Sequence, residues 1–257
     1  MQYRQWILGC LLALAVPGLA QHQYLRFENV GINTGLSHSY IKCMEQDDLG
    51  FLWFGTLNGL NRYDGYSFKV YKNLPADQHS VGSNQINDIA RSHDGDLWIA
   101  TSGGGLSLYC RKDDRFHSFQ HEPESANSIS TNFINCLLQD PSGKVWIGTE
   151  GAGLDLFNPE NKSFEHYTAR KYPGLGDDYI QALTHTSDDF IWIGTQRGGL
   201  SRFDPSDQTF QHYPLLAGEG GISEIQNVRA VFEDSQSRLW IGTSGGGLFQ
   251  YDRESDQ

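Results

Sequence analysis

The sequence is poor in basic residues. Only 19 Lys and Arg stand against 31 Asp and Glu among 257 residues, which gives a formal net charge of −12 at pH 7. Nucleic-acid binding draws most of its affinity from Lys and Arg that neutralise phosphates, so the composition argues against a nucleic-acid partner. An acidic surface also repels anionic lipid head groups, and its simplest role is to keep a protein in solution.

Long apolar runs are also scarce. One run, from Ile7 to Val16, follows the single basic residue Arg4 and ends in small residues near Ala20. This pattern is typical of a secretory signal peptide, so we expect residues 1–20 to be a signal peptide that is cleaved after Ala20. The run is too short for a comfortable membrane span of about 20 residues. The mature protein, 21–257, is therefore expected in the periplasm or another extracytoplasmic space.

Cysteine is rare and shows no pattern. Cys10 lies within the apolar run, which continues past it and so argues against lipid attachment there. The other three, Cys43, Cys110 and Cys136, are an odd number and show no Cys-x-x-Cys or metal-like spacing. We predict no metal site and no cofactor, and we interpret Cys43 and Cys136 as small apolar fillers in a repeated structure.

Helical periodicity is absent as well, which excludes a helical solenoid. What the sequence has instead is a repeat, marked by Trp residues spaced by 45, 48, 46 and 48 positions. Each Trp opens a short motif, followed by a glycine-rich turn with a leucine and an aromatic residue three positions later. The five motifs are Trp53-Phe54-Gly55-Thr56, Trp98-Ile99-Ala100-Thr101, Trp146-Ile147-Gly148-Thr149, Trp192-Ile193-Gly194-Thr195 and Trp240-Ile241-Gly242-Thr243.

Turn signals divide each repeat into four short strands. In the third repeat we expect strands at Phe133–Gln139, Lys144–Thr149, Gly153–Phe157 and Ser163–Tyr167, separated by turns rich in Pro, Gly, Asn and Ser. Repeated units of four antiparallel strands are propeller blades. The fold class predicted is therefore all-β: a β-propeller of four-stranded blades, with about five blades present.

The repeat also assigns roles to single positions. A Trp at one strand position of every blade suits packing between neighbouring blades better than stacking on a sugar. We expect buried side chains twelve and nine residues before each Trp. These are Ile41, Ile86, Ile134, Ile180 and Val228, and Met44, Ile89, Leu137, Leu183 and Val231.

The fifth repeat lacks the Phe-x-x-aromatic element that closes the others. One interpretation is a closed ring of five blades, in which a strand at Tyr24–Phe27 completes the last blade. The other is a truncated piece of a longer propeller, which the abrupt polar stop after Tyr251 favours.

Two rows of polar residues are candidates for ligand binding near the propeller axis. They lie fourteen and eleven residues before each Trp: Ser39, Asn84, Asn132, Asp178 and Gln226, and Lys42, Asn87, Asn135, Gln181 and Arg229. We select Asn84, Asn132, Asp178, Gln226, Asn135 and Gln181 as site residues for a glycan or another small polar ligand. The alternative is that these side chains line a wet channel or satisfy loop backbone.

The repeat resembles the two-component regulator propeller family. The segment Asp140–Thr149 reads Asp-Pro-Ser-Gly-Lys-Val-Trp-Ile-Gly-Thr, and Asp47–Thr56 reads Asp-Asp-Leu-Gly-Phe-Leu-Trp-Phe-Gly-Thr. Gly35–Ser39 and Tyr63–Phe68 look like the first blade of that family. The sequence departs from the pattern at Ala100, in place of Gly, and in the turn before Trp192.

The resemblance implies a periplasmic sensor module for signal transduction through a phosphorelay, often with glycans as ligands. Relatives continue into a membrane helix and a histidine kinase or a diguanylate cyclase, so this chain would reach the membrane only through such a downstream segment. A homodimer is among the expected assemblies. No catalytic residues are predicted, because the histidines form no ligand-like pair and no nucleophile motif is present. The alternatives are a secreted propeller enzyme such as a lyase, and a protein-interaction propeller.

Overall fold

The computed structural model describes residues 27–217 and 223–253, and its regular structure is almost entirely β. Four blades have four strands each, joined in chain order. The inner-to-outer strands are β1 (Ile41–Gln46), β2 (Leu52–Thr56), β3 (Gly59–Tyr63) and β4 (Phe68–Tyr71) in blade 1; β5 (Ile86–Arg91), β6 (Leu97–Thr101), β7 (Leu106–Cys110) and β8 (Arg115–Phe119) in blade 2; β9 (Ile134–Gln139), β10 (Val145–Thr149), β11 (Leu154–Asn158) and β12 (Ser163–Tyr167) in blade 3; and β13 (Ile180–His185), β14 (Ile191–Thr195), β15 (Leu200–Asp204) and β16 (Thr209–Tyr213) in blade 4.

Blade 5 contains three strands, β19 (Val228–Glu233), β20 (Leu239–Thr243) and β21 (Leu248–Tyr251). A two-stranded hairpin, β17 (Leu215–Ala217) and β18 (Ser223–Ile225), precedes it, and two short 3-10 helices, η1 (Ile32–Thr34) and η2 (Pro173–Leu175), lie in loops. The predicted strands of the third repeat are confirmed to within one residue at each end. The predicted signal peptide and most of the Tyr24–Phe27 segment lie outside the described residues.

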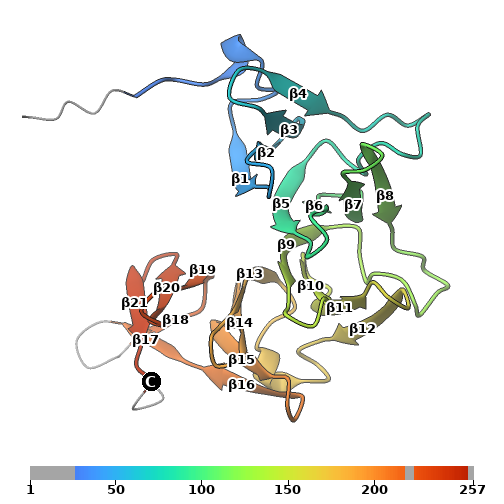
Figure 1. Ribbon diagram of the computed structural model, residues 1–257. Coiled ribbons are helices and arrows are strands. Elements are labelled where there is room, and N and C mark those ends of the chain that lie inside the picture. The colour runs from blue at the N-terminus through green and yellow to red at the C-terminus, as the bar shows by residue number, and fades with distance from the viewer. Residues whose placement is uncertain (1–26, 218–222, 254–257) are drawn as a thin grey trace, which may run out of the picture.

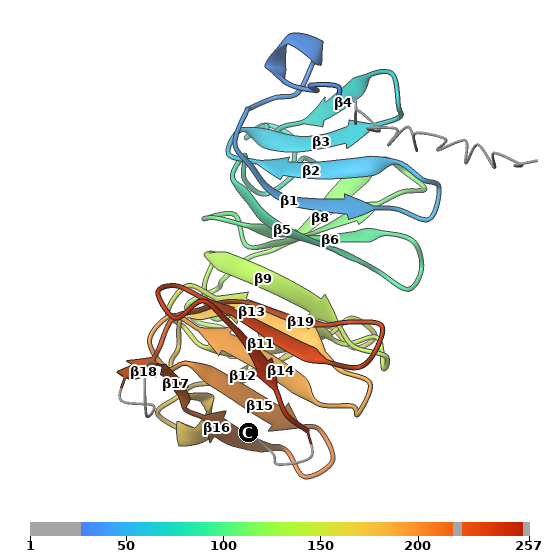
Figure 2. The same cartoon turned by 90° about the vertical axis from the view of Figure 1, so that its left-hand side faces the viewer.

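The five blades follow one another around a common axis. Each inner strand contacts the inner strand of the next blade, in the order β1, β5, β9, β13 and β19. In Figures 1 and 2 the blades form an open arc, with blade 1 standing apart from blade 5. The all-β propeller expected from the repeat is therefore confirmed.

The repeated Trp residues lie in the seams between blades. Trp53 contacts Tyr109 of the next blade, with ring centroids 4.8 Å apart, and Trp146 contacts Phe203 at 5.0 Å. Trp192 and Tyr251 repeat the contact at 4.8 Å. The structural interpretation holds for Trp53, Trp98, Trp146 and Trp192, because each of these rings is buried against a neighbouring blade, whereas Trp240 of blade 5 is only partly buried.

The same seams explain the side chain twelve residues before each Trp. Ile86, Ile134, Ile180 and Val228 are each 0% exposed because they pack against the preceding blade. In blade 1 the prediction is wrong: Ile41 is 38% exposed and Met44 is 67% exposed. No described segment packs on that side of blade 1, so the repeat position alone does not bury its side chain.

Blade 5 leaves its opposite side uncovered for the same reason. Leu248 is 66% exposed, whereas the equivalent Leu60, Leu106 and Leu154 are 0% exposed. The described arc therefore carries an exposed apolar face at each end.

An aspartate organises the turn between the first two strands in three of the blades. In blade 3 the Asp140 carboxylate accepts hydrogen bonds from the backbone N–H groups of Ser142 (2.9 Å) and Lys144 (3.1 Å). Its second oxygen accepts the indole N–H of Trp146 at 2.9 Å. The first Asp of the repeated motif thus joins the turn to the blade seam, a role that needs a carboxylate and not merely a polar residue.

Candidate functional site

The axial end of the propeller holds a pocket of about 450 Å³. Its lining includes the whole row of polar residues that lies eleven positions before each Trp. The lining residues are Tyr40, Ile41, Lys42, Asn87, Asn135, Tyr179, Gln181, Gln196 and Arg229. The structure therefore brings Asn135 and Gln181, two of the predicted site residues, to one cavity with side chains from all five blades.

Hydrogen bonds across the blades position this row. The Lys42 ammonium donates to Asn87 Oδ1 at 2.6 Å, and Asn87 Nδ2 donates to the Ile134 carbonyl at 2.6 Å. Asn135 Nδ2 donates to the Ile180 carbonyl at 2.9 Å. The amide nitrogens are thereby held by backbone. The Gln181 carbonyl oxygen is buried and has no hydrogen-bond partner in the described structure.

The axial pocket differs in charge from the protein as a whole. Its lining carries two cationic side chains, Lys42 and Arg229, and no carboxylate. Next to the pocket residue Asn87 lies Asp88, a partly exposed acid whose carboxylate accepts the backbone N–H groups of Ile89 and Leu137. Burial raises the pKa of Asp88 to about 6. The pocket thus presents cations, amides and two tyrosines to a polar ligand.

The row lying fourteen residues before each Trp is placed differently. The side chains of Asn84, Asn132 and Asp178 accept backbone N–H groups of the preceding loops, from Asn73 (2.8 Å), His121 (2.7 Å) and Ala169 (2.7 Å) respectively. Gln226 is exposed, and its backbone carbonyl accepts the Gly199 N–H. The structure does not place these four predicted site residues in the axial pocket.

Cys43 and Cys136 occupy the blade seams. Cys43 and Cys136 are both free thiols, and Cys136 is 7% exposed. Burial raises the pKa of both thiols well above the ordinary value, so they stay protonated and unreactive at neutral pH. Within the described ranges no cluster of His, Cys, Asp and Glu has a metal-binding arrangement, and no helix there is long and apolar enough to cross a membrane.

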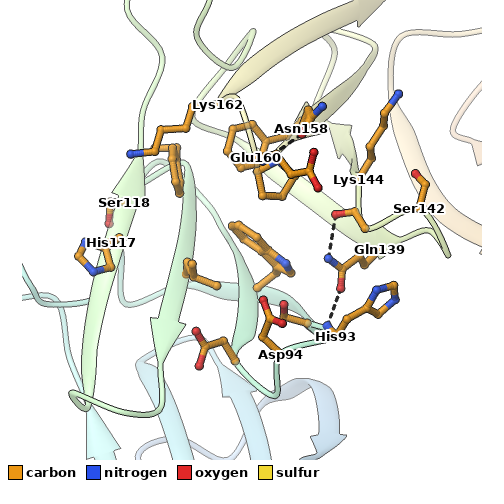
Figure 3. Close-up of a pocket in the computed structure, with 18 of the residues that line it drawn as sticks. His93, Asp94, His117, Ser118, Gln139, Ser142, Lys144, Asn158, Glu160 and Lys162 are labelled. Carbon is orange, nitrogen blue, oxygen red and sulfur yellow. Dashed lines mark hydrogen bonds between the residues drawn. The ribbon is translucent and has the colours of Figure 1, made fainter.

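A second and larger cavity, of about 880 Å³, lies between blades 2 and 3 (Figure 3). Its floor includes Trp98 and Phe157, and its rim carries His93, Asp94 and Lys144 among other polar residues. Sequence reasoning missed this cavity. The signal that could have found it is Ser92, which stands where blades 1, 3 and 5 have the turn aspartate.

The chain is similar to two proteins whose names refer to signalling. Histidine kinase P4 of Formosa agariphila is 43% identical over 68 residues, which are 26% of this chain and 5% of that protein. A solved extracellular domain of a protein named as a hybrid two-component system of B. thetaiotaomicron superposes with a TM-score of 0.78 and 28% identity. That alignment covers 90% of this chain and 31% of the solved chain, so the present chain spans about a third of it.

Propeller enzymes share the fold. Virginiamycin B lyase from Staphylococcus aureus superposes with a TM-score of 0.60 over 85% of this chain and 71% of its own, at 14% identity. An identity that low shows a common architecture and carries no argument about activity.

The repeats themselves match a family model. The model described as two-component regulator propeller matches residues 35–58, 80–103, 128–151, 174–197 and 224–245. These five segments each end just past a Trp motif and recur once in every blade. The chain belongs to the two-component regulator propeller family.

Proposed function

We propose that this chain is the ligand-sensing propeller of a two-component-type signalling protein, working outside the cytoplasm. The observation that carries the proposal is the axial pocket, where five blades each contribute one polar side chain to a single cavity. Such a pocket couples a ligand to the relative position of all the blades, because no single blade holds the ligand alone. Family membership and the extracellular relatives support the same role.

The lining chemistry favours a ligand rich in hydroxyl groups, such as a glycan fragment. The side-chain amides of Asn135 and Gln181 line the pocket and are of a type that exchanges hydrogen bonds with hydroxyl groups, while Lys42 and Arg229 can donate to ring or carboxyl oxygens. We infer that the chain binds its ligand without transforming it. The lyase alternative has only the shared architecture beside it, and that likeness carries no argument about activity.

The test is a titration of oligosaccharide fragments from plant and animal polysaccharides against the protein, followed by calorimetry. With a binding fragment in hand, Asn135→Ala and Gln181→Ala should each weaken affinity by roughly tenfold, the cost of one to two hydrogen bonds to a bound ligand. Gln120→Ala, an exposed position away from the pocket, is the matched control and should bind as the unaltered protein does.

Two results would count against the proposal. Unchanged affinity in both pocket variants would remove the axial pocket as the ligand site. Conversion of the fragment on incubation, detected by mass spectrometry, would favour the lyase alternative over a sensor.

A further inference from the structure

Three blades use one carboxylate to gather three N–H donors. In blade 1 the Asp47 carboxylate accepts the backbone N–H groups of Leu49 and Phe51, both at 3.0 Å, and the Trp53 indole N–H at 2.8 Å. Asp140 in blade 3 and Asp234 in blade 5 accept the equivalent donors at 2.9 to 3.1 Å. The arrangement is therefore a repeated carboxylate-binding site that the chain normally fills itself.

Blade 2 keeps the turn but lacks the carboxylate. The Ser92 N–H donates to the Asp96 carbonyl at 2.8 Å and the Gly95 N–H donates to the Ser92 carbonyl at 3.0 Å, as in the turn of blade 3. The side chain at the aspartate position is now a serine, too short to reach the indole. Trp98 is 2% exposed, and its indole N–H has no hydrogen-bond partner in the described structure. A buried donor without an acceptor costs free energy unless something else supplies one.

Blade 4 also lacks the aspartate, but its site is closed. Thr186 is 1% exposed and its hydroxyl donates to Asp188 at 2.6 Å. The Arg202 guanidinium covers this region, 4.2 Å from the ring centroid of Phe190 and 5.7 Å from that of Trp192. Trp192 therefore lies beneath a packed side-chain layer.

In blade 2 the covering pair is missing. The positions of Phe190 and Arg202 are occupied by Asp96 and Leu108, and both of these line the 880 Å³ cavity together with Trp98. Gln139 of blade 3 holds the turn in place from the other side. Its amide accepts the His93 N–H at 2.9 Å and donates to the Gly143 carbonyl at 2.9 Å (Figure 3). The unfilled donor set thus lies beside a preformed cavity whose lining includes Trp98, with the indole nitrogen itself just beneath the cavity surface.

We propose that this cavity binds a sugar acid, whose carboxylate takes the place of the missing turn aspartate. The backbone N–H groups of Asp94 and Asp96 and the Trp98 indole N–H would donate to it, as their counterparts do to Asp140. The remaining rim suits hydroxyl groups: Asp94 and Glu160 can accept their protons, Ser118 and Asn158 can donate or accept, and Lys162 can donate. The rim acids disfavour a second negative charge, so a ligand with one carboxylate and several hydroxyls fits best.

This site is separate from the axial pocket, and the proposal does not rest on the sensing function. It is tested by following the indole N–H resonances of ¹⁵N-labelled protein during a titration with sodium D-glucuronate. The Trp98 resonance is expected to shift, and that of Trp192 to stay in place. The methyl ester of glucuronic acid, which has the same hydroxyls without the charge, should bind at least roughly tenfold more weakly.

The decisive variant is Ser92→Asp, which supplies the carboxylate from the chain. It should fold well, because blades 1, 3 and 5 have aspartate at this position, and it should abolish the glucuronate-induced shift. Thr186→Asp makes the same change in blade 4 and should leave glucuronate binding intact. A Trp98 resonance that does not move with glucuronate, or that moves equally in Ser92→Asp, would overturn the proposal.

Discussion

Gly148 of blade 3 lies so close to Ile180 of blade 4 that a methyl group on Gly148 would be 2.8 Å from Ile180 Cγ2. Gly55 and Ile86 repeat the relationship at 2.7 Å, and Gly194 and Val228 at 2.6 Å. In blades 1, 3 and 4 the glycine of the repeated motif is thus set by the approach of the next blade, whereas the seam between blades 2 and 3 accommodates the methyl group of Ala100.

Replacing Gly148 by Ala should therefore destabilise the protein. The new methyl group would meet both Ile180 and the Cys136 thiol, and overpacking of this kind costs about 1 to 3 kcal/mol. Gly242 in blade 5 is the control, because a methyl group there would meet only Ala230, at ordinary contact distances of 3.5 Å from Cβ and 3.9 Å from the carbonyl oxygen. Urea unfolding should show a large loss of stability for Gly148→Ala and little for Gly242→Ala. Equal losses would mean that the glycine is needed for the conformation of its own strand and not for the close approach of the next blade.

The packing of the repeated Trp rings between neighbouring blades leads to a second prediction about stability. Trp146→Ala should lower the free energy of unfolding by about 3 to 5 kcal/mol, because it removes a ring packed against Phe203 of the next blade. Trp240 has the same bond to its turn aspartate but no described blade beyond it, and it is only partly buried. Trp240→Ala should cost about half as much. Denaturant midpoints of the two variants, compared with the unaltered protein, test the ordering.

The turn aspartate should contribute to stability through its three N–H partners. Asp140→Ala leaves the buried Trp146 indole N–H without an acceptor and should cost about 2 kcal/mol. Asp140→Asn should recover part of that loss, since its carbonyl oxygen can still accept the backbone N–H groups. Asp94→Ala, at an exposed position with no side-chain hydrogen bond in the described structure, is the control and should melt within a few degrees of the unaltered protein.

The sequence predicted the blades well because their determinants are local and repeat. The Trp motif, the turn glycines and the alternating apolar residues recur in register, so strand boundaries in the third repeat could be placed to within one residue. Ile41 and Met44 were misassigned because a repeat position predicts burial only when a neighbour packs on it. Whether a neighbouring blade packs on a given position depends on the whole arc of blades, and the sequence of a single repeat does not show it.

The candidate site was predictable only in part. Asn135 and Gln181 lie on inner strands, whose side-chain directions follow from strand periodicity. Asn132 and Asp178 lie in connecting loops, where the loop backbone decides what a side chain contacts, and no periodicity describes that path. The blade 2 cavity depends on three residues together, Ser92, Asp96 and Leu108, which differ from their equivalents in other blades. Their combined effect is seen only when the blades are compared in three dimensions.

Asp88 makes the stability of the protein depend on pH, and the direction of this dependence follows from the burial of its carboxylate. Burial raises its pKa to about 6 in the folded protein, from the 3.8 of an exposed aspartate. Between these values the folded protein binds a proton that the unfolded chain has released, so stability falls as the pH rises through this window. Hydrogen bonds from Ile89 and Leu137 offset part of the burial cost but do not remove it.

Asp88→Ala should remove this dependence, and Ala182 and Ala230 show that alanine fits the position in other blades. The free energy of unfolding of the variant, relative to the unaltered protein, should increase by about 2 kcal/mol between pH 4 and pH 7. The variant also loses the hydrogen bonds that Asp88 accepts. This loss lowers the free energy of unfolding by the same amount at every pH, so it does not affect the change between pH 4 and pH 7. Urea titrations at pH 4, 5, 6 and 7 measure the change, with Asp94→Ala as the surface control. A constant difference across the range would show that Asp88 ionises in the fold as readily as it does in the unfolded chain.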